Sequence, residues 1–177
     1  MKKFKLLFWL CVLSACFILT GCKKDARLEN VTENTISVDK KGKITEYLIE
    51  PVDKEYYSDE ELENYVKSQV DGAESVTLKH FSVDNGTAKA TLQYKDAESF
   101  QAFNQQLLWF SELSGADKAD VAFAGNGTVP EKGWVVVTEF ETRIVGPGEP
   151  AAWSDGVTVT EDGICQTSEK RCVMIYK

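Results

Sequence analysis

The turn Asp84-Asn85-Gly86 is the short stretch that most restricts how this chain can fold. It separates two stretches of alternating apolar and polar residues, 76–83 and 87–94. Asn followed by Gly suits a two-residue hairpin turn, because both central positions require a positive φ. In the second stretch the apolar residues share one face: Ala88, Ala90, Leu92 and Tyr94. The sequence therefore predicts an antiparallel hairpin with one packed and one solvated face.

A similar hairpin is predicted earlier, from residues 36–38 and 44–49, with Gly42 at the end of a four-residue loop. A helix signal follows each hairpin. Ser58 and Glu61 have the spacing of a capping box, and Asp96 can cap a second helix. The expected apolar faces are Leu62, Tyr65, Val66 and Val70 in the first helix, and Phe100, Phe103, Leu107 and Phe110 in the second. The chain is thus expected to contain two ββα units.

The C-terminal part of the chain is expected to add further strands. Residues 111–130 are rich in Gly, Ala, Ser and Asp and predict a long loop. Residues 134–145 are the longest strand candidate, and residues 157–160 and 172–176 are two more. We therefore expect an α+β domain, with an antiparallel sheet of about six to eight strands built from hairpins and two helices packed on one face.

The beginning of the chain has the pattern of an export leader. Lys2, Lys3 and Lys5 precede a run of 14 uncharged residues, 6–19, which is shorter than the roughly 20 that span a bilayer. Leu19-Thr20-Gly21-Cys22 resembles the lipobox of bacterial lipoproteins, which implies cleavage before Cys22 and attachment of lipid to its thiol. Two acyl chains make a stable anchor, whereas one gives marginal binding. An uncleaved helix and an ordinary signal peptide with a chance cysteine are the alternatives.

This leader determines the expected domain organisation. Residues 1–21 are a signal peptide, residues 22–35 hold the lipidated cysteine and a flexible tether, and residues 36–177 form a single domain on the extracytoplasmic face of the cell membrane. Removing the leader leaves 17 Lys and Arg against 28 Asp and Glu, a net charge of −11. Such a charge repels phosphate backbones, so we expect membrane attachment through lipid and no nucleic-acid partner.

Two cysteines, Cys165 and Cys172, remain in the expected domain. They flank a polar turn between two apolar stretches, and a disulfide across it would contribute about 2–3 kcal/mol. A structural disulfide is the first interpretation, because export favours oxidation, and two buried free thiols are the second. A redox-active pair is the third, since the spacing is not C-x-x-C.

Two further segments carry a second resemblance. "DKEYYSDEELENYV" and "DNGTAKATLQYKDAESFQAFN", behind the lipobox, resemble small lipoproteins of anaerobic Gram-positive bacteria. The resemblance covers residues 36–110 and implies the location and the fold. It includes no catalytic motif and assigns no site residue.

Catalytic and metal-binding patterns are not found in the sequence. His80 is the single histidine, so a histidine-ligated metal site is excluded, and a half-buried place in the sheet is expected for it. The acids Asp59, Glu60, Glu61 and Glu63 are better explained as first-turn residues that complement a helix dipole. The segment 125–127 lacks the spacing and the lysine of a phosphate loop. We expect no catalytic residue, no metal and no cofactor.

Four aromatic residues are the candidates for a ligand surface. Tyr56 and Tyr57 precede the first helix, Trp109 lies off the inward face of the second, and Trp153 is expected in a Pro/Gly-rich loop. Exposed aromatic side chains around a cleft can bind sugars or peptides. The alternative is that these side chains complete a modest core.

The expected function is a membrane-anchored, non-enzymatic binding or interaction module at the cell envelope. Its ligand would be an envelope protein, a glycan or a peptide. One alternative is an envelope hydrolase that uses a pair of carboxylates beside residues 111–130. Another is a regulatory partner or inhibitor of a membrane protein, which an exposed sheet edge or apolar patch would favour.

Overall fold

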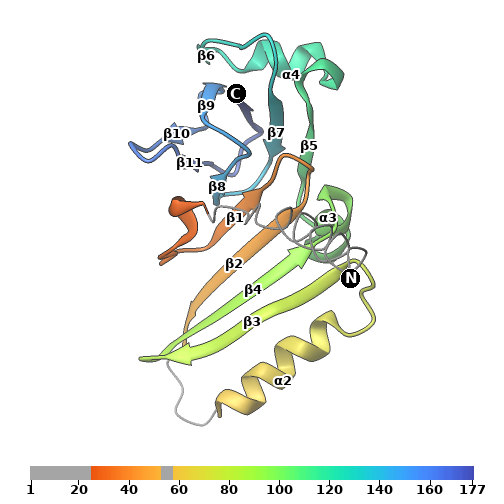
Figure 1. Cartoon of the computed structure of the whole chain (residues 1–177), viewed down its shortest axis with the longest axis vertical. Helices are drawn as coiled ribbons and strands as arrows, with labels where there is room; N and C mark the ends of the chain where they lie inside the picture. Colours follow the sequence, from red (N-terminus) through yellow and green to blue (C-terminus); the bar gives the residue numbers. More distant parts are fainter. Residues whose placement is uncertain (1–24, 53–57) are drawn as a thin grey trace, which may run out of the picture.

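The computed structural model describes residues 25–52 and 58–177 (Figure 1). The expected leader, Cys22, Tyr56 and Tyr57 lie outside the described residues. The described part has the α+β fold that the sequence predicted. Its strands form two sheets, however, and not the single sheet that we expected. No helix in this part has the length and the apolar character that crossing a bilayer requires.

The larger sheet contains seven strands of the described chain. They are β1 (Thr35–Val38), β2 (Ile44–Pro51), β3 (Val76–Asp84), β4 (Thr87–Tyr94), β8 (Arg143–Val145), β10 (Thr158–Val159) and β11 (Cys165–Gln166). Their order in the sheet is β10-β11-β8-β1-β2-β4-β3. β1 and β8 run parallel and the other neighbours pair antiparallel. The parallel pair joins the N-terminal hairpins to the C-terminal part of the chain.

The smaller sheet contains five strands of the described chain, all antiparallel. They are β5 (Leu108–Glu112), β6 (Asn126–Gly127), β7 (Trp134–Thr138), β9 (Pro150–Trp153) and β12 (Cys172–Tyr176). The order is β5-β7-β12-β9-β6, so the last strand of the chain occupies the centre of the sheet.

The helices of the described chain are η1 (Ala26–Leu28), α2 (Asp59–Val70), α3 (Ala97–Asn104), η2 (Leu113–Gly115) and α4 (Lys118–Phe123). α2 lies beside β3 at one end of the molecule and α4 lies near the opposite end (Figure 1). Residues 111–130, which we expected to form a long loop, contain η2, α4 and β6.

Both predicted hairpins are confirmed. Asn85 and Gly86 have φ values of 50° and 74°, as the two-residue turn requires, and join β3 to β4. Gly42 has a φ of 79° in the loop between β1 and β2. A side chain at Gly42 would also contact the ring of Phe110, since an added Cβ would lie 2.7 Å from it.

The start of α2 is also confirmed. The Ser58 hydroxyl accepts a hydrogen bond from the Glu61 amide, and the Glu61 carboxylate accepts one from the Ser58 amide. The predicted apolar face is wrong at Tyr65, whose exposed fraction is 64%. Val66 and Val70 do pack against the core.

The second helix is shorter than predicted, because Gln105 adopts a left-handed φ of 55° and ends α3 at Asn104. Leu107 and Phe110 therefore lie outside the helix, and the expected four-residue stripe is wrong for these two residues. Phe110 belongs to β5, and Leu107 is the residue immediately before this strand.

The long strand expected over residues 134–145 is likewise wrong. The chain leaves the smaller sheet after Thr138 and enters the larger sheet at Arg143. Between them, Phe140 turns inward and stacks on Phe100 with a centroid distance of 5.9 Å. Two strands of different sheets thus replace one strand.

Two hydrophobic clusters hold the described chain together. The inner core lies between the two sheets and includes Ile44, Tyr94, Phe100, Val136 and Met174. The outer core lies on the other face of the smaller sheet, where Val135, Val137, Val173 and Ile175 pack against residues of α4 and the segment before it. Alternate residues of β7 and β12 serve the two cores, so both faces of these strands are buried.

Candidate functional site

A cleft of about 560 Å³ lies at the start of β7. We call it the Trp134 cleft. Three neighbouring strands position its walls. Trp134 of β7 pairs with Glu112 of β5 on one side and with Tyr176 of β12 on the other. Lys177, the residue after Tyr176, also lines the cleft. The full lining consists of Glu112, Ser114, Glu131, Lys132, Gly133, Trp134 and Lys177.

The local sequence explains why the Trp134 cleft forms. The carbonyl of Gly133 accepts a hydrogen bond from the Leu113 amide at 2.8 Å. A Cβ on Gly133 would lie 2.0 Å from the backbone oxygen of Tyr176, so only glycine allows β7 to begin this close to β12. This close approach places the half-buried indole of Trp134 on the wall of the cleft.

The Trp134 cleft combines an aromatic surface with cationic groups. Lys132 and Lys177 line it, and the Nζ atom of Lys40 lies 5.0 Å from the centroid of the indole ring. The Lys177 ammonium also lies 3.4 Å from the carboxylate of Glu149. An indole can stack on a flat or apolar ligand face, and ammonium groups can bind an anionic substituent. The arrangement therefore suits a polar ligand that has both features.

The structure does not combine the predicted tryptophans into one site. Trp109 packs against the outer core and Trp153 against the inner core, on opposite faces of the smaller sheet. Neither lines the Trp134 cleft. Trp134 was not among the candidate ligand residues, because its exposure depends on the close approach of Gly133 to Tyr176 on another strand.

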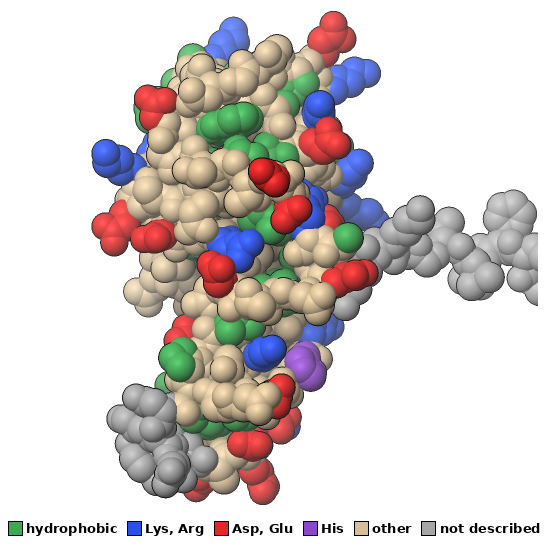
Figure 2. Space-filling view, turned by 90° about the vertical axis from the view of Figure 1, so that its left-hand side faces the viewer, with side chains coloured by type: hydrophobic (Ala, Val, Ile, Leu, Met, Phe, Trp, Pro, Cys, Tyr) green, Lys and Arg blue, Asp and Glu red, His purple; other side chains and the backbone are tan. Residues whose placement is uncertain are grey.

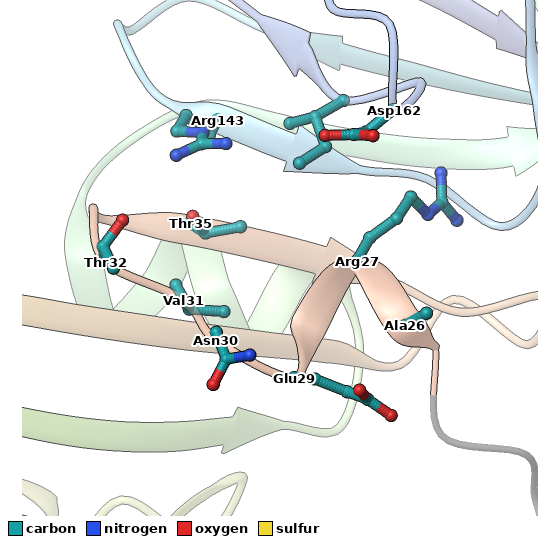
Figure 3. Close-up of a pocket in the computed structure, with 10 residues that line it drawn as sticks. Ala26, Arg27, Glu29, Asn30, Val31, Thr32, Thr35, Arg143 and Asp162 are labelled. Atoms are coloured by element: carbon teal, nitrogen blue, oxygen red, sulfur yellow. The ribbon is translucent and has the colours of Figure 1, made fainter.

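A second cleft, of about 370 Å³, lies beside η1 (Figure 3). We call it the N-terminal cleft. Arg143 of β8 is on one side, and Asp162 of the β10–β11 turn and Glu29 are on the others. Arg143 makes an ion pair with the exposed Glu33 at 3.1 Å. The cleft is strongly polar and both of its arginines already have acidic partners, which makes it a weaker ligand site than the Trp134 cleft.

Arg27 closes one side of the N-terminal cleft and attaches the start of the described chain to the domain. Its guanidinium donates hydrogen bonds to the backbone oxygens of Gly146, Gly148 and Gly163 at 3.1, 3.2 and 3.3 Å. It also binds the Asp25 carboxylate at 2.6 Å, and this hydrogen bond lowers the pKa of Asp25. We call these groups the Arg27 cluster. Residues 25–34, which we had assigned to a flexible tether, are therefore packed on the domain.

A buried carboxyl group lies in a third, smaller cleft of about 160 Å³. Glu46 is 8% exposed and accepts a hydrogen bond from the Tyr94 hydroxyl at 2.5 Å. Asn104 donates in turn to that hydroxyl at 3.1 Å. Burial raises the pKa of Glu46 above its usual value, although the bond from Tyr94 partly offsets this. Glu141 lines the same cleft, which we call the Glu46 cleft.

The expected disulfide is not formed in the described chain. Cys165 and Cys172 are both buried, free thiols. They do not flank a hairpin: Cys165 belongs to β11 of the larger sheet and Cys172 to β12 of the smaller one. The Cys172 thiol donates instead to the backbone oxygen of Gly156 at 3.3 Å. Burial raises the pKa of Cys165 to about 11, which makes this thiol unreactive at neutral pH.

A partner-binding edge or apolar patch receives little support from the described residues. Their exposed large hydrophobic residues are Tyr65, Phe123 and Val129, which lie on separate segments. β3 is an edge strand, but it has a bulge near Leu78 and carries Lys79, and both features discourage pairing with another strand. Figure 2 shows acidic and basic side chains interspersed over one face.

No group of three or more metal-ligating side chains occurs among residues 25–52 and 58–177. His80, expected to be half-buried, is exposed on β3. Comparison with protein-family models, with curated proteins and with solved structures finds no match for this chain. The features of the chain that bear on function are therefore the geometry of its clefts and the sequence of its leader.

Proposed function

We propose that this chain is a lipid-anchored, extracytoplasmic binding module that takes a glycan or peptide ligand in the Trp134 cleft. The anchor part of the proposal is supported by the lipobox-like sequence that ends at Cys22. The binding part is supported chiefly by one observation, the indole of Trp134 on the wall of a 560 Å³ cleft that also contains two lysines. The fit is to a ligand with an apolar or ring-shaped face and an anionic group.

The charge of the domain strengthens this choice of ligand. The expected mature chain has a net charge of −11, so most of its surface repels anions. The Trp134 cleft gathers three cations, Lys132, Lys177 and the nearby Lys40, beside the lining acids Glu112 and Glu131. An acidic sugar or the carboxylate of a short peptide would be attracted there, with the indole providing contact area.

Two measurements test the proposal. Mass spectrometry of the membrane-extracted protein should find diacylglycerol on Cys22, and a Cys22→Ala variant should leave the membrane fraction. Titration with cell-wall disaccharide-peptide fragments should change tryptophan fluorescence, and Trp134→Leu should abolish binding. Trp109→Leu is the matched control, because Trp109 packs on the outer core away from the cleft. Equal binding by both variants would exclude the Trp134 cleft as the site.

The Glu46 cleft supports a second candidate function, hydrolysis by a pair of carboxylates. A carboxyl with a raised pKa, Glu46, lines the same cleft as Glu141, and such a pair can supply a general acid and a general base. The cleft is small, with room for about five water molecules. Turnover of a cell-wall glycan that Glu46→Gln abolishes would favour this function over binding alone.

A further inference from the structure

The packing of residues 25–34 on the domain changes what a lipid at Cys22 would do. Between Cys22 and Asp25 there are two residues, Lys23 and Lys24. Three residues of extended chain reach about 11 Å at most. A tether that continued to residue 35, as the sequence suggested, would have reached about 45 Å.

The Arg27 cluster fixes the point on the domain from which this short link to Cys22 begins, and so restricts how the domain can be oriented relative to the bilayer. Arg27 is bonded to three backbone oxygens from two separate loops, at Gly146 and Gly148 before β9 and at Gly163 between β10 and β11. The start of the described chain is thus attached to the domain at one place. Exposed residues around that place are Ala26, Glu29, Asn30, Glu149 and Asp162, which we call the proximal face.

We propose that the bilayer surface is the partner of the proximal face, because the two-residue link holds this face toward the lipid headgroups in one orientation. This inference rests on the lipid anchor at Cys22, and not on the ligand of the Trp134 cleft. α2 and α4 lie at opposite ends of the molecule, and both are distant from η1, which is the described helix nearest to the anchor (Figure 1).

The charges determine how closely the proximal face approaches the bilayer. Glu29, Glu149 and Asp162 are exposed acids, so the face is repelled by anionic lipid within a Debye length of about 8 Å. Lys23 and Lys24 are attracted to the same surface, by about 1 kcal/mol each. Electrostatic repulsion therefore limits how closely the acidic proximal face approaches the headgroups.

This orientation also places the N-terminal cleft relative to the membrane. The cleft is lined by Ala26, Glu29, Asn30 and Asp162, so it opens on the proximal face. A ligand of the N-terminal cleft would consequently be met close to the headgroups.

The test uses the full-length lipidated protein in vesicles of phosphatidylcholine and phosphatidylglycerol that contain a headgroup-attached quencher. A fluorophore is placed on the proximal side at Glu161→Cys, or on distant helices at Lys118→Cys or Gln69→Cys. The native Cys165 and Cys172 are buried and are not expected to react. Quenching should be several-fold greater at position 161 than at positions 118 and 69.

A control variant with a 20-residue Gly/Ser insertion between Lys24 and Asp25 should reduce this contrast, since such a linker has a typical span of about 25 Å. Equal quenching at all three positions, with lipid present on Cys22, would overturn the orientation and leave the anchor intact. Absence of lipid from Cys22 would overturn both the anchor and the orientation.

Discussion

The substitution Arg27→Ala tests whether the N-terminal segment contributes to the stability of the domain. The change removes three hydrogen bonds from a charged donor to the backbone oxygens of Gly146, Gly148 and Gly163. Hydrogen bonds to charged groups are worth about 1.5–3 kcal/mol each when short and buried. Here the distances are 3.1–3.3 Å and the side chain is 19% exposed, which argues for a value below this range.

Taking about 1 kcal/mol for each bond, we expect Arg27→Ala to lower the free energy of unfolding by about 3 kcal/mol. With a urea m-value of about 2 kcal/mol/M, the midpoint of unfolding should fall by about 1.5 M. The assay is urea unfolding of the purified protein, followed by tryptophan fluorescence. Arg27→Lys should be intermediate, because an ammonium group cannot reach the carboxylate and three carbonyls at once.

Arg171→Ala provides the matched control. Arg171 has two acidic partners, Asp120 at 2.8 Å and Glu139 at 2.9 Å, whereas Arg27 has one, but the Arg171 side chain is 44% exposed and bonds no backbone oxygen. Exposed ion pairs contribute about 0–1 kcal/mol, so this midpoint should change little. If the two alanine variants unfold at the same urea concentration, the Arg27 cluster does not stabilise the domain as argued.

Three further predictions concern the interior. Phe100→Ala should lower the free energy of unfolding by about 3–5 kcal/mol, since Phe100 is fully buried. Phe123→Ala should change it by about 0.5 kcal/mol or less, because the Phe123 side chain is 54% exposed. Similar shifts of the two variants in thermal unfolding would contradict this prediction. Because the pKa of Glu46 is raised, the contribution of this residue to stability is fully present below the usual Glu pKa and is lost as the pH rises through the raised one. Glu46→Gln should therefore gain stability relative to wild type from pH 4 to pH 7 in urea titrations. Cys165 should resist iodoacetamide at pH 7 in the folded protein and react after unfolding, as peptide mass spectrometry can show; rapid labelling of the native protein would contradict the buried, high-pKa thiol.

The parts of the fold that were predictable are those where local chemistry and tertiary structure agree. Asn85-Gly86 fits a turn that few other residue pairs adopt, and the Ser58–Glu61 pair satisfies amides that any helix start leaves free. Neither feature depends on distant residues. Such elements are fixed by contacts within a few positions of the chain.

The incorrect predictions occur where two apolar stretches follow each other without a strong turn residue. Nothing in the types of Gln105 or Phe140 indicates that a helix ends at one and that a strand changes sheets at the other. Both choices are determined by packing, since Phe140 stacks on Phe100 between the sheets. Periodicity alone cannot distinguish one long element from two short ones.

The clefts could not be predicted for a related reason. The Trp134 cleft combines residues 112–114, 131–134 and 177, and the N-terminal cleft combines residues near 30 with 143 and 162. These segments meet only through the strand order of the two sheets. The exposure of Trp134 depends on the close approach of Gly133 to Tyr176, which is a contact between strands and not a local signal.

The position of β12 has a consequence for the order in which the molecule folds. β12 is the centre of the smaller sheet and pairs with β7 and β9, yet it is formed by residues 172–176 of a 177-residue chain. The hairpins β1–β2 and β3–β4 join segments that are close in sequence, so they can form before the C-terminal strands are available. The smaller sheet has no central strand until residues 172–176 are available to pair with β7 and β9. Removal of these residues would thus remove the strand on which both its neighbours depend.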